Sequence, residues 1–174
     1  NNIFKNLSYF GVTLYDYPAG VPSSGHVITD NKFQDFGTYD SGSGVDFWGG
    51  GVLLYNNQYT RIANNVMTNV RLGIQTGNFY QANPGSTSSQ VIDNNAIEAR
   101  RTGVFHNLHY TAASTFTFSN NSITALNNAN ETRWDGIALS SLSVPSVSYN
   151  NTINGNSITR TNLTKGYEIW NVQT

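Results

Sequence analysis

The sequence predicts an all-β protein, a right-handed parallel β-helix of about six coils, and three observations lead to that prediction. Charged residues make up only 11% of the 174 residues, whereas Asn, Gly, Ser and Thr are abundant. An apolar–Asn–apolar motif recurs, and a Gly–aliphatic pair follows each copy. Poor helix formers that alternate with β-branched and aromatic residues favour many short strands. Repetition at a period of about 30 residues indicates coils that stack on one another.

The first motif is an apolar residue, two variable positions, Asn, one variable position and a second apolar residue. Its Asn is separated from the next by 29, 34, 30, 26 and 35 residues. These positions are Asn2, Asn31, Asn65, Asn95, Asn121 and Asn156. The second motif follows as Gly11-Val12, Gly51-Val52, Gly73-Ile74, Gly103-Val104, Gly136-Ile137 and a degenerate Gly166-Tyr167. Two strand signals in each period suit a solenoid whose coils differ in their corner loops.

Stacked coils place equivalent residues in columns along the axis. The predicted inward columns are Phe4, Phe33, Met67, Ile97, Ile123 and Ile158; Val12, Val52, Ile74, Val104 and Ile137; and Ile62, Ile92, Phe118 and Ile153. The repeated Asn is predicted to lie at a turn, in the left-handed conformation, with its amide in a ladder along the axis. We therefore expect these asparagines to be structural.

The two motifs resemble the repeats of the pectin-lyase-like superfamily, across nearly all of the chain. The resemblance implies one β-helix domain over residues 1–174, or a fragment of a longer solenoid, and a secreted or cell-surface location. Members include polysaccharide lyases, glycoside hydrolases, epimerases, tailspikes and adhesins, so the fold does not fix the activity. No paired-Asp or Gly-His-Gly signature of polygalacturonase-type hydrolases is present, and no catalytic residue carries over by motif.

Two coils carry long insertions at the same corner. The spacing from the motif Asn to the motif Gly is 9, 20, 8, 8, 15 and 10 residues in successive coils. The insertions cover residues 35–50 and 126–135, and the two coils between them have the shortest corners. At about 4.8 Å per strand spacing the insertions lie about 14 Å apart. They are predicted to form the walls of a groove.

The predicted groove combines cationic and aromatic side chains. Arg71 and Arg101 each lie two residues before a motif Gly, and Arg100 lies beside Arg101. The expected wall residues are Asp46, Trp48, Glu131, Trp134 and Asp135. Trp faces pack on sugar rings and guanidinium groups suit carboxylates. The predicted partner is therefore a polysaccharide or oligosaccharide, with Trp48, Trp134, Arg100 and Glu131 as binding residues.

The sequence leaves catalysis open. In a lyase, Arg71 or Arg101 would neutralise a uronate carboxylate, and in a hydrolase Asp46 and Asp135 would be the acid and base. The alternative is that the arginines pair with Asp46, Glu131 or Asp135. The chain is then a non-catalytic structural or adhesive module that associates end to end or laterally through open strand edges.

Other partners receive little support. A net charge of −1 gives no reason to expect nucleic acid, and no apolar stretch is long enough to span a membrane. No cofactor is expected, and no metal ligand set is assigned. His106 and His109 lack a third ligand, and His106 is expected to be packed in a column with Leu54 and Leu139. Residues 40–46 only loosely resemble a calcium loop, because carboxylates are sparse.

Overall fold

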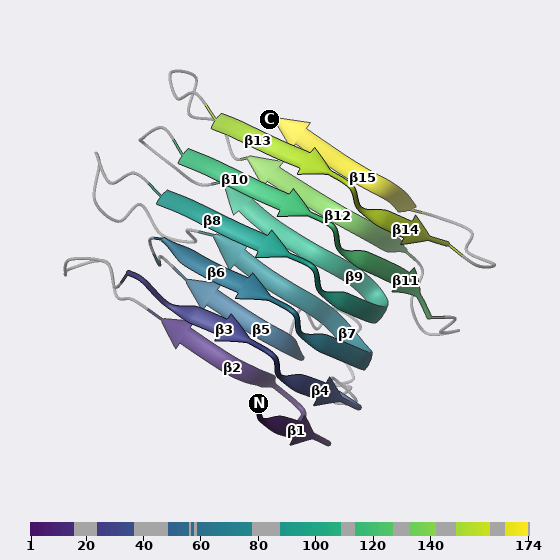
Figure 1. The fold of residues 1–174 in the computed structure, drawn as a ribbon. Coiled ribbons are helices and arrows are strands. Elements are labelled where there is room, and N and C mark those ends of the chain that lie inside the picture. Colours follow the sequence, from purple (N-terminus) through teal and green to yellow (C-terminus); the bar gives the residue numbers. More distant parts are fainter. Residues whose placement is uncertain are drawn as a thin grey trace.

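A computed structural model describes residues 1–15, 24–36, 49–55, 57, 59–77, 88–108, 114–126, 133–141, 149–160 and 166–173. All regular secondary structure within these ranges is β-strand. The strands lie across a common axis and stack from the N-terminal end to the C-terminal end (Figure 1). Every strand pair is parallel. The all-β parallel prediction is therefore confirmed.

One face of the stack is a five-stranded sheet. Its strands occur in the order β13-β10-β8-β6-β3. Their bounds are β3 Val27–Thr29, β6 Thr60–Ala63, β8 Ser88–Asp93, β10 Ser114–Ser119 and β13 Tyr149–Asn154.

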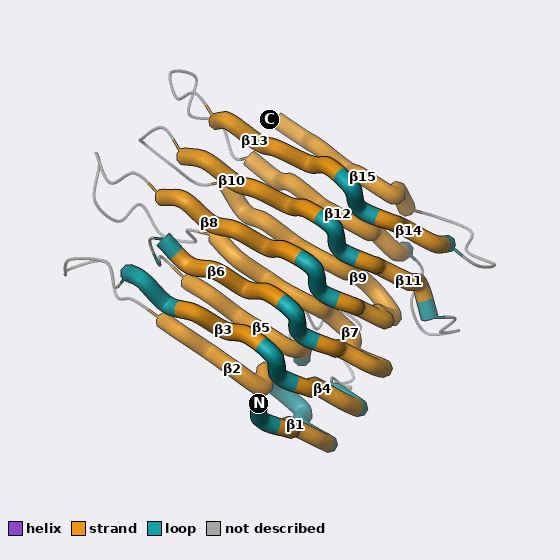
Figure 2. Tube along the Cα trace, in the orientation of Figure 1, coloured by secondary structure: helices purple, strands orange, loops and turns teal. Residues whose placement is uncertain are grey.

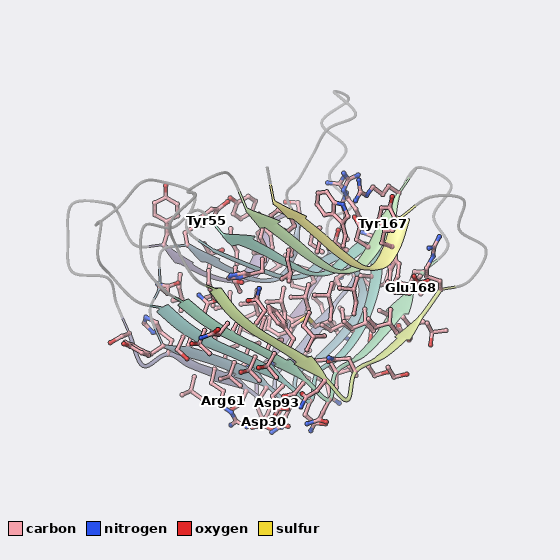
Figure 3. All side chains as sticks on the ribbon, turned by 90° about the horizontal axis from the view of Figure 1, so that it is seen from above. Asp30, Tyr55, Arg61, Asp93, Tyr167 and Glu168 are labelled. Atoms are coloured by element: carbon pink, nitrogen blue, oxygen red, sulfur yellow. The ribbon has the colours of Figure 1, made fainter. Side chains whose placement is uncertain are left out.

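The remaining strands form a ten-stranded sheet that has two branches. The first branch contains β1 Ile3–Lys5, β4 Lys32–Gln34, β11 Ser122–Ala125 and β14 Ser157–Thr159. The second branch contains β2 Phe10–Tyr15, β5 Gly50–Tyr55, β12 Trp134–Ser141 and β15 Gly166–Gln173. Two long strands, β7 Val66–Gly77 and β9 Ala96–Leu108, belong to both branches. Seen from above, Tyr55 and Tyr167 lie on one side, and Asp30, Arg61 and Asp93 lie on the opposite side (Figure 3).

A short turn joins each strand of the five-stranded sheet to the first branch, and these turns stack in a row (Figure 2). The residue with positive φ in each turn precedes the ladder Asn. These residues are Asp30, Asn64, Asn94, Asn120 and Gly155. The prediction that the ladder Asn itself is left-handed is wrong. Its exposed neighbour makes the bend, which leaves the ladder Asn to point inward, and only residues that tolerate this conformation occupy the bending position.

The inward asparagines form the predicted ladder. Each of the first five, Asn2 to Asn121, donates from its backbone N–H and its side-chain Nδ2 to Oδ1 of the Asn in the next coil, at 2.9–3.2 Å. The side-chain amides of Asn65 and Asn95 also donate to backbone carbonyl oxygens. Their polar groups are thus satisfied although the residues are almost fully buried. The expectation of a structural asparagine ladder is confirmed.

The inward columns are also confirmed by the strand register. Phe33 pairs with Met67, Met67 with Ile97, and Ile97 with Ile123. The column that begins at Val12 and the column that contains Ile92 follow the same rule. Together these residues form the main apolar core.

The glycines of the second motif lie where two columns come closest. A Cβ on Gly73 would lie 2.6 Å from Cγ2 of Ile97, and a Cβ on Gly103 would lie 2.4 Å from Cγ2 of Ile123. In the same way, a Cβ on Gly51 would come too close to the side chain of Met67, and a Cβ on Gly136 would come too close to that of Ile158. The motif therefore contains Gly because the inward residue of the next coil fills the space that a side chain would need.

Candidate functional site

A groove of about 290 Å³ lies on the outer face of the second branch. It crosses β7, β9, β12 and β15, so it spans three strand spacings, or about 14 Å. Its lining is largely apolar, with a few charged and polar groups. The lining residues are Leu72, Gln75, Arg101, Thr102, Phe105, Arg133, Asp135, Ala138 and Trp170. Such a lining is typical of a ligand site.

Four lining residues belong to one outward row of the parallel ladder. Gln75 pairs with Phe105, Phe105 with Ala138, and Ala138 with Trp170. Gln75, Phe105 and Ala138 each follow a buried aliphatic residue directly, so the alternation of the strand turns them outward. Trp170 lies in the same row through its register with Ala138. Phe105 and Trp170 are half-buried, whereas Ala138 between them is buried. The row thus presents two aromatic side chains two strand spacings apart, with a small residue between them.

A charged pair fixes one end of the groove. Arg133 donates from Nε to Oδ2 of Asp135 at 2.8 Å and from a terminal nitrogen to Oδ1 at 3.2 Å. Oδ1 also accepts the backbone N–H of Tyr167 at 3.1 Å. The guanidinium of Arg133 lies 4.4 Å from the ring centroid of Trp170 and 5.6 Å from that of Tyr167. Asp135 therefore holds Arg133 against these rings, and this geometry does not suit the predicted role of Asp135 as a catalytic acid or base.

The three predicted arginines meet at an irregularity of the ladder. Val70 pairs with Ala99 and Leu72 with Thr102, so the single Arg71 of β7 lies opposite both Arg100 and Arg101 of β9. This arrangement is a β-bulge, and a bulge redirects the side chains around it. Of the three, Arg101 lines the groove, and Arg71 and Arg100 do not.

Arg100 has a structural role that the sequence did not predict. Its guanidinium donates to the backbone oxygen of Asn69 at 3.1 Å, to the side-chain oxygen of Asn69, and to the backbone oxygen of Phe36. Asn69 in turn donates to Asp35 at 2.8 Å. Arg100 thus ties together the corners of adjacent coils, and the prediction that it binds ligand is not supported by its contacts.

Trp134 does not form a wall of the groove. Its side chain has no exposed surface, and its indole nitrogen donates to the backbone oxygen of Ala99 at 3.0 Å. The expectation that it stacks on a sugar is therefore wrong. It begins β12 with its ring inside the coil, close to Gly136, so it belongs to the core.

Several predicted site residues cannot be placed. Asp46, Trp48 and Glu131 lie outside the described residues, as do the 40–46 segment and His109. Their predicted roles remain predictions. Among the described residues no group of three or more His, Cys, Asp or Glu side chains could hold a metal ion.

His106 is packed, as predicted. It is fully buried, pairs with Thr76 and Leu139 in the strand ladder, and lies with its ring centroid 3.7 Å from that of Phe116. Its Nδ1 is 2.5 Å from the hydroxyl oxygen of Thr76. Burial in this apolar surrounding lowers the pKa of His106 to about 3.

Comparison with known proteins identifies the architecture. Residues 1–130 match a family described as the right handed beta helix region. No curated protein and no solved structure matches the chain. In the part of the chain that the structure describes, no helix is long and apolar enough to cross a membrane.

Proposed function

We propose that this chain, which belongs to the family of right-handed β-helix regions, binds a polysaccharide in the groove on its second branch. The outward row carries the proposal. Phe105 and Trp170 flank the small Ala138 on a regular ladder of strands, and the groove also contains Arg101 and Gln75. Aromatic faces with a few polar groups suit the apolar faces and hydroxyl groups of sugars.

The contacts of Trp170 restrict how a sugar would bind. Arg133 covers one face of the indole at 4.4 Å and is itself held by Asp135. The sugar would therefore pack on the opposite face. Arg101 and Arg133 both line the groove, and a guanidinium group suits the carboxylate of a uronate.

Binding is better supported than cleavage. The oxygens of Asp135 accept hydrogen bonds from Arg133 and from the backbone of Tyr167. A carboxylate in these contacts is poorly placed to transfer protons. We therefore propose a glycan-binding module that acts outside the cell, with lyase, hydrolase or epimerase activity as the less supported form of the same proposal.

The test is a binding screen against neutral and acidic polysaccharides, with Trp170→Ala as the variant. We expect the parent chain to bind at least one polysaccharide and Trp170→Ala to bind it at least tenfold more weakly at an unchanged melting temperature. Tyr59→Ala is the matched control, because Tyr59 is an exposed aromatic residue that does not line the groove. Equal binding by the parent chain and Trp170→Ala would refute the proposed site.

A structural or adhesive module is the second candidate, and exposed apolar residues favour it. Ile3 and Val27 on the edge strands β1 and β3 are 63% and 66% exposed, and Tyr167 and Ile169 on the edge strand β15 are 54% and 48% exposed. These surfaces suit contact with another β-helical coil. This candidate predicts concentration-dependent association in sedimentation velocity, and Ile169→Lys should abolish it. A monomer at all concentrations would exclude it.

A further inference from the structure

Gln75 lines the groove and carries a buried polar atom without a hydrogen-bond partner among the described residues. The residue is 5% exposed and lines the groove from β7. Its Oε1 has no hydrogen-bond partner among the described residues. An amide oxygen that leaves water and gains no donor raises the free energy of the folded chain. A bound ligand that supplied a donor would remove this penalty.

We propose that Gln75 is a ligand-binding residue and that its Oε1 accepts a hydrogen bond from a hydroxyl group of the bound sugar. This inference rests on the proposed function and assigns one position within it. Gln75 precedes Phe105 in the outward row, so the hydroxyl belongs to a ring that packs beside Phe105. In this arrangement a hydroxyl group on the edge of one sugar ring donates to Oε1 of Gln75, while the apolar face of the same ring packs on Phe105.

The chemistry of the acceptor sets a specificity. A carboxylate offers only acceptors, so it cannot satisfy Oε1 of Gln75. The ring next to Gln75 must present a hydroxyl there. A site with a buried hydrogen-bond acceptor discriminates strongly against a ligand that lacks the matching donor. An apolar pocket discriminates less strongly against a ligand that differs by one methylene group. A carboxylate elsewhere on the chain of sugars would instead suit a guanidinium group, and Arg101 also lines the groove.

A second glutamine provides a matched control. Gln90 is 3% exposed and its Oε1 also has no partner among the described residues. It lies on β8 of the five-stranded sheet and does not line the groove. Replacing either glutamine with Leu removes the unsatisfied acceptor. Gln90→Leu also removes the hydrogen bond from Nε2 of Gln90 to the backbone oxygen of Asn57, so only Gln75→Leu is expected to be as stable as the parent chain or more stable. Leu53 occupies the neighbouring position of the same outward row, on β5, so this row already contains a leucine.

The experiment is calorimetric titration of the parent chain, Gln75→Leu and Gln90→Leu with cellohexaose, xylohexaose and hexagalacturonate. We expect Gln75→Leu to bind about tenfold more weakly than the parent chain at an equal or higher melting temperature. Gln90→Leu should bind like the parent chain. If Gln75→Leu binds as tightly as the parent chain, the role of Gln75 is refuted and the proposed function stands. If the parent chain binds none of the three, both fall.

Gln75→Met provides a second variant if Gln75→Leu does not fold. Met is unbranched like Gln and offers at most a weak acceptor, so it also removes the amide oxygen without burying a charge. We expect Gln75→Met to bind about tenfold more weakly than the parent chain at an equal or higher melting temperature. Binding as tight as that of the parent chain would contradict the inference.

Discussion

The indole nitrogen of Trp134 donates a hydrogen bond to the backbone oxygen of Ala99 across 3.0 Å, inside the coil. The same oxygen accepts the backbone N–H of Leu126 at 2.9 Å. Trp134 thus connects the start of β12 to the first branch of the sheet. Trp134 is therefore a core residue, although in the sequence it lies in an insertion of variable length.

Replacing Trp134 should therefore destabilise the chain strongly. We expect Trp134→Ala to lower the free energy of unfolding by about 3–5 kcal/mol, because it removes a fully buried side chain. Trp134→Phe should cost less, since Leu126 still satisfies the oxygen of Ala99. Urea unfolding measures both, and a Trp134→Ala variant as stable as the parent chain would contradict the placement of the ring.

Breaking the asparagine ladder should also lower the stability of the folded chain. Asn95→Ala removes hydrogen bonds to Asn65, Asn121 and two backbone oxygens from a site that is 1% exposed. We expect a loss of about 2–4 kcal/mol in the free energy of unfolding, with no change in ligand selectivity. Asn156→Ala in a more exposed coil should cost less. Equal losses at the two positions would argue against burial as the cause.

The glycine column predicts a steric effect. A Cβ on Gly103 would lie 2.4 Å from Cγ2 of Ile123 and 2.6 Å from the backbone oxygen of Gly136. Gly103→Ala should therefore destabilise by about 3 kcal/mol or more. Gly25→Ala is the control, because a Cβ at this position would have no heavy atom within 4 Å and only the φ of 76° disfavours the substitution. For an alanine this backbone conformation costs about 1–2 kcal/mol. Thermal unfolding of both variants measures the two losses of stability, one caused by the steric clash at Gly103 and one by backbone strain at Gly25. A smaller loss for Gly103→Ala than for Gly25→Ala would refute the close contact between Gly103 and Ile123.

His106 predicts a pH dependence of stability. Its pKa is lowered from 6.5 to about 3, so between these values the unfolded chain takes up a proton that the folded chain does not. His106 should then reduce the free energy of unfolding as the pH falls below 6.5, by up to about 1.4 kcal/mol per pH unit. The control is Thr76→Val with His106→Leu, which removes both hydrogen-bonding partners. Its stability should fall less between pH 6.5 and 4, and parallel curves would contradict the assigned cause.

The repeat made most of the fold predictable from the sequence. An inward column must be filled in every coil, so apolar residues recur at Phe33, Met67 and Ile97 and give the register directly. The ladder Asn recurs because its amide bonds to its own copy in the next coil. The left-handed position was misassigned by one residue, because Asn also occupies the preceding position in three of the turns, at Asn64, Asn94 and Asn120.

The site was less predictable because outward residues do not repeat. Arg101 and Asp135, which the sequence singled out, line this groove, whereas Gln75, Phe105 and Trp170 were not singled out. A usable signal was present for Gln75 and Phe105, since each directly follows a buried aliphatic residue and must point outward. Trp134 was expected on a wall of the groove but lies in the core, because the length of an insertion does not show whether a side chain points inward or outward. Arg100 does not line this groove, and the bulge opposite Arg71 that redirects it arises from pairing between coils, which the spacing of the motifs does not show.

The most direct test of the proposed groove is to follow the backbone amide resonances of the chain during titration with an oligosaccharide that it binds. If a sugar binds in the groove, the largest shifts should occur at Gln75, Phe105, Ala138 and Trp170, which line it. Shifts concentrated around Arg61 and Asp93, on the opposite side of the coil (Figure 3), would contradict it.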